Sequence, residues 1–235
     1  MFGKIEAVLF DLDETLLDAR IGLAKAHERI VQLVSGFLRE REIHVDLGAL
    51  SSKVRLLDDR MNRESRYDRD LWWPILAVEI ESGLVFPENF IHRLTAEYWE
   101  AYSQHSPPYS DTVSTLTDLK QRGYGLGLVT DTDGSPGFKT DRINKLAFRD
   151  LFSVIVVAGE DTVELKPSPA PFLKASKMLD VSTEVTVFVG DKPFTDIEGA
   201  KAAGMRTIHV LRREWDSTVK ADLTIKTLAE LRNIL

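Results

Sequence analysis

A short apolar run that ends in two carboxylates constrains the fold of this chain more than any other feature. The run covers residues 7–10, Ala-Val-Leu-Phe, and it is followed by Asp11 and Asp13. Such a run, with Val and Phe in it and a turn signal after it, is typical of a buried strand. Buried parallel strands occur in open α/β sheets, whose ligands bind where the carboxyl ends of the strands open. We therefore expect Asp11 at the rim of a parallel sheet and Asp13 in the loop just beyond it.

The two neighbouring acids also predict chemistry. Two carboxylates this close repel each other unless a cation or a proton lies between them. Mg²⁺ prefers oxygen ligands and suits such a place. A structural alternative is that Asp13 or Thr15 caps the helix that follows. This stretch alone leaves both interpretations open.

Composition limits the classes of protein to consider. The 235 residues are 43% hydrophobic and 29% charged, which suits one or two soluble globular domains. The net charge of −7 argues against nucleic acid or an anionic membrane as a partner, and the lack of cysteine excludes thiolate catalysis. No apolar run approaches the ~20 residues of a membrane span, and the N-terminus lacks a signal-peptide pattern. We therefore expect a cytoplasmic protein with no membrane partner.

Residues 18–107 show a helical pattern throughout. Apolar residues recur at three- and four-residue steps, which predicts helices over about 19–42, 47–61, 70–82 and 87–102. We expect Trp72 and Trp73 to pack a small helical core, with contact to a substrate as the alternative. The charge-rich stretch 55–70 is expected to be a solvated helix face with local ion pairs.

The rest of the chain alternates between strands and helices. Strands are expected at 124–130, 152–158, 185–189, 207–211 and 221–225, and helices at 111–121, 138–146, 169–179, 194–203 and the C-terminus. This alternation is typical of βαβ units and a parallel sheet. The simplest architecture is an α/β core, formed by residues 1–17 and 108–235, with an all-helical insertion at 18–107.

Two of the later strand ends carry residues suited to phosphate. Thr130 and Asp131 end one strand, where a hydroxyl and exposed backbone N–H groups can hold a phosphate oxygen, although a plain turn explains them equally well. Lys166 follows the next strand and precedes two prolines, which fix it in place. A fixed ammonium could neutralise an attacking carboxylate and a phosphate together, whereas a surface lysine is the structural alternative.

A further strand end carries two more acids. Asp191 and Asp196 bracket the start of a helix after the strand at 185–189. Acids there can cap the helix, or they can complete the oxygen shell of a cation held by Asp11. Because the carboxyl ends of parallel strands converge in space, we expect all these residues at one rim.

Together the motifs resemble the haloacid dehalogenase-like (HAD) hydrolase superfamily. They are Asp-Leu-Asp-Glu-Thr-Leu at 11–16, Val-Thr-Asp at 129–131, Lys-Pro at 166–167 and Gly-Asp-Lys-Pro-Phe-Thr-Asp-Ile at 190–197. The resemblance covers nearly the whole chain. It implies an α/β, Rossmann-like parallel-sheet core with an inserted helical type-1 cap. It also implies a Mg²⁺-dependent phosphatase acting on a small phosphorylated metabolite.

The resemblance implies a catalytic role for three residues. Asp11 is the nucleophile and forms an aspartyl-phosphate, while Lys166 steadies the charge on nucleophile and phosphate. Asp13 is the general acid to the leaving oxygen and the general base for the hydrolytic water, so we expect its pKa to be raised from ~3.9 by its acidic surroundings. Members that are true dehalogenases lack an acid at this position, so Asp13 favours a phosphatase.

The resemblance also implies binding roles. Thr130 and the backbone N–H of Asp131 bind the phosphoryl oxygens; Asp191 ligates Mg²⁺, the backbone carbonyl of Asp13 joins it, and Asp196 supports it. Many relatives have Asn in place of Asp131, whose extra carboxylate would repel a phosphate unless it points away. The alternatives to a phosphatase are a β-phosphoglucomutase-like phosphomutase and a non-catalytic phosphate-binding or scaffold protein.

Overall fold

The computed structural model describes residues 3–235, which divide into two compact units. The α/β unit runs up to Asp18 and continues with Pro108–Thr132 and Pro136–Leu235. The helical unit consists of Ala19–Pro107 together with Asp133–Ser135. The sequence analysis did not expect the last three of these residues, which follow a strand of the sheet, to belong to the helical unit.

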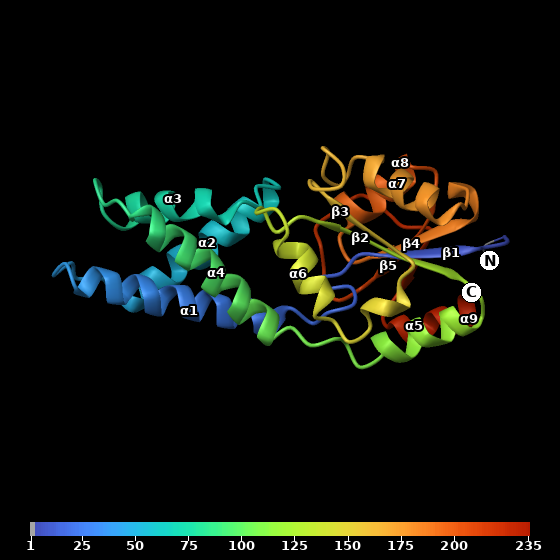
Figure 1. The fold of residues 1–235 in the computed structure, drawn as a ribbon, viewed down its shortest axis with the longest axis horizontal. Coiled ribbons are helices and arrows are strands. Elements are labelled where there is room, and N and C mark those ends of the chain that lie inside the picture. The colour runs from blue at the N-terminus through green and yellow to red at the C-terminus, as the bar shows by residue number, and fades with distance from the viewer. Residues whose placement is uncertain (1–2) are drawn as a thin grey trace. The chain divides into compact units, whose positions relative to one another are not determined.

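The α/β unit is built on one six-stranded parallel sheet. Its strands stand in the order β3-β2-β1-β4-β5-β6, which confirms the α/β class. The first strand, blue in Figure 1, therefore lies inside the sheet between β2 and β4, and the strand order reverses there. In open α/β sheets, ligands bind at such a reversal, outside the carboxyl ends of the strands. The strands are β1 (Ala7–Phe10), β2 (Gly125–Asp131), β3 (Val154–Ala158), β4 (Thr186–Gly190), β5 (Arg206–Val210) and β6 (Leu223–Ile225).

Helices cover both faces of this sheet. Figure 1 shows α7 (Ala170–Leu179) and α8 (Glu198–Ala202) on one face, and α5 (Thr112–Gln121) and α9 (Leu231–Ile234) on the other. Val8 and Phe10 of β1 belong to the same apolar cluster as Leu116 of α5, whereas Leu9 packs in the cluster of Phe172 of α7. Successive side chains of a strand point to opposite faces, so a strand buried on both sides is apolar at every position.

The helical unit contains four helices, α1 (Arg20–Arg39), α2 (Leu47–Arg63), α3 (Trp72–Ile80) and α4 (Glu88–Gln104). Gly22 lets α1 approach the end of α4 closely, because a Cβ at this position would lie 2.5 Å from the carbonyl oxygen of Tyr102. Trp72 and Trp73 are both 1% exposed, which confirms that they pack a helical core. Among the helices of residues 3–235, none is long and apolar enough to span a bilayer.

A buried polar network in this unit corrects the interpretation of the stretch 55–70. Asp58 and Arg69 are buried, so the expected solvated face is wrong for these two residues. The Asp58 carboxylate lies 2.7 Å from His27 Nε2 and accepts a hydrogen bond of 2.6 Å from the Tyr98 hydroxyl. The Arg69 guanidinium lies 4.2 Å from the ring centre of Tyr98 and 3.9 Å from that of Trp99. Hydrogen bonds and aromatic faces thus accommodate the buried charges.

The segment after β4 also differs from expectation. In place of one helix over 194–203, the chain forms a π-helical turn, Pro193–Ile197, which leads into α8. A π-helical turn inserts an extra residue into the helical repeat, and such turns are frequent at functional sites. Asp196 lies in this turn.

Candidate active site

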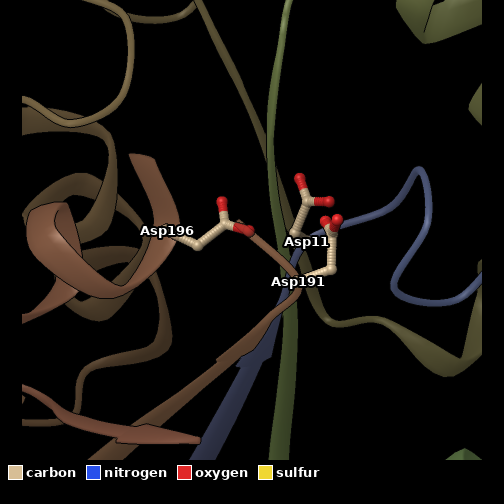
Figure 2. A group of neighbouring side chains, drawn as sticks. All are labelled: Asp11, Asp191 and Asp196. Carbon is tan, nitrogen blue, oxygen red and sulfur yellow. The ribbon is translucent and has the colours of Figure 1, made fainter. Parts of the chain in front are cut away.

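Three buried carboxylates meet at the rim of the sheet where β1 and β4 end. Asp11 follows β1 directly, Asp191 follows β4, and Asp196 comes from the π-helical turn behind it. Each has a carboxylate oxygen within 4.8 Å of the others. Figure 2 shows the carboxylate of Asp196 directed from its turn toward those of Asp11 and Asp191. Residues separated by about 180 positions in the chain thus form one acidic cluster.

The local backbone explains how these acids come so close. The N–H of Asp11 donates to the carbonyl of Val189 at 3.0 Å, which continues the pairing of β1 with β4 past the end of the strand. Gly190 is required beside Asp196, because a Cβ at this position would lie 2.4 Å from Asp196 Oδ2. The same Oδ2 atom accepts a hydrogen bond of 3.0 Å from the N–H of Lys192, which fixes the Asp196 side chain.

Lys166 is the cation that contacts this cluster directly, and Lys192 lies close enough to act on it through its charge. Lys166 Nζ donates to Asp11 Oδ1 and to Asp196 Oδ1, both at 2.7 Å, and its side chain is 3% exposed. Burial alone would lower the pKa of Lys166, but Asp11 and Asp196 outweigh it and raise that pKa well above its usual value. The ammonium is therefore charged at neutral pH.

The charges of Lys166 and Lys192 do not offset the cost of burying three carboxylates together. Burial and the neighbouring Asp196 raise the pKa of Asp11, although Lys166 opposes this. Burial, together with Asp196 and Asp11, outweighs the opposing charge of Lys192 and raises the pKa of Asp191 well above its usual value. Asp191 Oδ1 receives only a long hydrogen bond of 3.5 Å from Thr15, and Oδ2 is buried with no hydrogen-bond partner among residues 3–235.

These observations fit a bound divalent cation. A buried carboxylate oxygen without a donor is costly, and carboxylates crowded together repel each other. A hard cation such as Mg²⁺ takes oxygen ligands and removes both costs at once. The oxygen-only donor set of Asp11, Asp191 and Asp196 therefore suits Mg²⁺ better than a softer metal.

Thr130 and Asp131 lie at the same rim, as the last residues of β2. Leu128 is paired with Phe10, so the following residues of β2 extend alongside Asp11. Thr130 is buried. Asp131 Oδ1 accepts a hydrogen bond of 3.0 Å from the backbone N–H of Lys166, so this carboxylate is engaged with the Lys166 segment. That contact directs one oxygen of the Asp131 carboxylate toward the backbone of Lys166.

Asp13 is held by two cations that the sequence analysis did not single out. Lys139 Nζ donates to Asp13 Oδ2 at 2.8 Å, and Arg142 Nη2 donates to Asp13 Oδ1 at 2.6 Å. Burial would raise the pKa of Asp13, but Arg142 and Lys139 outweigh it and hold that pKa well below its usual range. The expected rise is therefore wrong. The sequence did carry a signal for this contact. Lys139 and Arg142 are two cations three positions apart on the helix expected at 138–146, which follows the motif Val-Thr-Asp at 129–131.

The fold and the site define a class of α/β protein with a cluster of acids at the strand ends and a helical insertion after β1. Residues 8–210 match the haloacid dehalogenase-like hydrolase family, and the chain belongs to that family. This confirms the resemblance in the sequence.

Curated relatives and solved structures agree with this membership. The chain is 32% identical to a phosphoglycolate phosphatase of Chromobacterium violaceum, over 98% of this chain and 96% of that protein. It is 29% identical to a glyceraldehyde 3-phosphate phosphatase of Methanopyrus kandleri, over 90% of this chain and 86% of that protein. A HAD phosphatase structure from Thermococcus onnurineus is 28% identical and superposes with a TM-score of 0.68, covering 98% of this chain and 97% of its own.

Proposed function

We propose that the protein is a Mg²⁺-dependent phosphatase that hydrolyses a small phosphorylated metabolite through an aspartyl-phosphate on Asp11. The observation that carries the proposal is the pairing of Asp11 with Lys166, beside an Asp191 oxygen that has no hydrogen-bond partner in the described part of the chain. The phosphatases among the relatives of this chain support the same reaction. They differ from each other in substrate, so we propose the class of reaction and leave the particular ester to experiment.

Asp11 acts as the nucleophile. A carboxylate is a weak nucleophile toward a phosphate dianion, because the two negative charges repel each other. Lys166 lowers this repulsion and holds one oxygen of Asp11 in place through its 2.7 Å hydrogen bond. A Mg²⁺ ion held by Asp11, Asp191 and the backbone carbonyl of Asp13, with Asp196 in support, would supply further positive charge to the phosphoryl group.

The remaining predicted residues bind the phosphoryl group and move protons. Thr130 and the backbone N–H of Asp131 hold phosphoryl oxygens at the end of β2. Asp13 accepts a proton from the hydrolytic water. The resemblance also implies that Asp13 gives a proton to the leaving oxygen, but Lys139 and Arg142 keep this carboxyl ionised and oppose that step. The ionised carboxylate that Lys139 and Arg142 stabilise is the form needed to accept the proton of the water.

We further propose that the helical unit acts as a cap. It is inserted directly after the loop that carries Asp13, so the chain leads from the catalytic loop straight into α1. A cap of this kind would select the substrate and keep bulk water from the reacting groups.

A metabolite screen tests the proposed function. The purified protein is assayed with Mg²⁺ against some tens of phosphorylated metabolites, and inorganic phosphate is measured. We expect net phosphate release from at least one ester, and a fall of at least about 1000-fold in the Asp11→Asn variant. A phosphomutase would interconvert esters with little net phosphate, and a scaffold protein would release none. Either result, or full activity in Asp11→Asn free of contaminating phosphatase and of deamidated protein, would contradict the proposal.

A further inference from the structure

The carboxylate of Asp13 accepts hydrogen bonds from two residues on one face of a single helix. Lys139 and Arg142 both belong to α6 (Phe138–Asn144), and residues three apart on a helix lie on the same side. Lys139 donates a hydrogen bond to Oδ2. Arg142 donates one to Oδ1 and a longer one, of 3.5 Å, to Oδ2. Because each oxygen has its own charged donor, both the position and the rotation of the carboxylate are defined.

The two cations are themselves well placed to act as a rigid support. Both are buried, so their long side chains have little freedom to move. Ile143, on the same helix, is 1% exposed and belongs to the apolar core between the sheet and α5. This anchor fixes α6 against the sheet that carries Asp11.

The segment before α6 is fixed as well. Glu160, which follows β3, accepts hydrogen bonds from the Thr132 hydroxyl at 2.7 Å and from the N–H of Gly137 at 3.0 Å. These contacts bridge the end of β2 and the start of α6. A continuous path of contacts therefore leads from the sheet through α6 to the Asp13 carboxylate.

We propose that Lys139 and Arg142 are positioning residues that hold Asp13 where it accepts the proton of the hydrolytic water. The inference rests on the proposed phosphatase function and adds two residues outside the motifs that define the family resemblance. In the step concerned, the water oxygen forms a bond to phosphorus and the bond from phosphorus to Asp11 breaks. Asp11 leaves as a carboxylate, and the proton of the water passes to Asp13. A misplaced Asp13 slows this step.

The two half-reactions can be measured separately with p-nitrophenyl phosphate and Mg²⁺, with the protein in excess. Nitrophenolate leaves without needing a proton, so the first half-reaction, phosphorylation of Asp11, does not depend on Asp13 as an acid. Nitrophenol absorbance reports that half-reaction. A phosphate sensor reports the second half-reaction, and the intact mass of the protein reports the accumulated aspartyl-phosphate.

We expect Arg142→Met and Lys139→Met to separate the two readouts. A misplacement of about 1 Å can cost about 100-fold, so phosphate release should slow by about that factor, while nitrophenol release stays within about threefold of the original protein. Phosphorylated protein should then accumulate. Arg142→Lys, which keeps the charge, should recover part of the loss. The control Lys145→Met removes an exposed cation just beyond α6 and should change neither rate.

A second comparison asks whether the two cations act through Asp13. In an Asp13→Asn background, adding Arg142→Met should slow phosphate release no further, because the group that it positions is already gone. The inference is overturned if Arg142→Met and Lys139→Met slow both half-reactions equally, if they slow neither, or if the loss persists in the Asp13→Asn background. Two other results would contradict the proposed function itself, and this inference with it. The original protein would release no nitrophenol, or Asp11→Asn would release nitrophenol as fast as the original protein.

Discussion

At the scale of single residues, the acidic cluster is costly to the folded protein. Asp11, Asp191 and Asp196 share one buried ammonium, and burial raises the pKa values of Asp11 and Asp191. An acid whose pKa is higher in the folded state than in the unfolded state destabilises the fold once the pH rises above its unfolded value of about 3.9. At neutral pH, the folded protein without metal therefore bears the cost of this arrangement.

This cost predicts how Asp191→Asn changes thermal stability. Without metal, in EDTA at neutral pH, the variant should be at least as stable as the original protein, because it removes a buried charge. Mg²⁺ at about 100 times its dissociation constant should stabilise the original protein by about 2.7 kcal/mol and the variant by much less. Thermal unfolding in EDTA and in MgCl₂ measures both effects.

The matched control for this prediction is Asp216→Asn, which removes an exposed acid. It should keep the full response to Mg²⁺. If Asp191→Asn gained as much from Mg²⁺ as the original protein does, the cluster would not be the metal site.

The residues at the strand ends could be read from the sequence, but their partners could not. The motifs at Asp11, Lys166 and Asp191 follow apolar runs, and parallel strands bring such ends together. The ion pairs of Lys139 and Arg142 with Asp13 depend on where α6 lies against the loop after β1. Periodicity predicts that a helix forms there, but it does not show which charged residues of the helix are buried or what they contact. For this reason the sequence analysis predicted a raised pKa for Asp13, whereas the structure lowers it.

At the scale of elements, hydrophobic periodicity predicts the bounds of strands and helices closely where the apolar pattern is clear. The strand expected at 185–189 is found at Thr186–Gly190, and the helix expected at 111–121 is found at Thr112–Gln121. The stretch 55–70 was harder, because a buried Asp and a buried Arg look like any surface charges in a sequence. Asp58 can be buried because His27 and Tyr98, far away in the chain, supply two of its hydrogen bonds, in addition to the one from the nearby Asn62.

This network predicts that Asp58→Asn destabilises the helical unit. Burial would raise the pKa of Asp58, but hydrogen bonds from His27 and Tyr98 and the charge of Arg69 outweigh it and lower that pKa. Breaking a buried charge pair costs about 3–5 kcal/mol, so we expect a loss of about 3 kcal/mol in the free energy of unfolding at neutral pH. Urea unfolding followed by far-UV circular dichroism measures it.

The effect of Asp58→Asn should depend on pH in a defined direction. A depressed pKa stabilises the fold above the unfolded value of about 3.9, and this contribution disappears as the pH falls through the folded pKa. The difference between the two proteins should therefore shrink below about pH 4. Asp59→Asn, at an exposed neighbouring position, should cost little at any pH. A loss that stayed constant down to low pH would contradict an ionised Asp58.

At the scale of the whole molecule, the chain passes between the two units four times. It leaves the α/β unit after Asp18, returns at Pro108, leaves again after Thr132 and returns at Pro136. The first two passages were expected from the change in sequence pattern at residues 18 and 107. The other two were not, because a three-residue excursion has no periodicity, and what assigns Asp133–Ser135 to the helical unit is contact with residues distant in the chain.

Gly134 marks that contact and allows it to be tested. A Cβ at Gly134 would lie 2.3 Å from the Cα of Asp68, and the residue has φ +96°. Gly83, in the same unit, has φ +87° with nothing near its missing Cβ, so Gly83→Ala measures the backbone strain alone. That strain costs about 1–2 kcal/mol, and forcing an atom into a filled space adds about 1–3 kcal/mol. We therefore expect Gly134→Ala to lower the free energy of unfolding by about 2 kcal/mol more than Gly83→Ala does.

Urea unfolding monitored by tryptophan fluorescence suits this comparison, since Trp72, Trp73 and Trp99 all lie in the helical unit. Equal losses in the two variants would mean that Gly134 does not pack against the backbone of Asp68 in solution. A larger loss in Gly134→Ala would show that the loop after β2 is held by residues of the helical unit. Changes in that unit would then be felt at Thr130 and Asp131 through only a few peptide bonds, independently of the connections at residues 18 and 107.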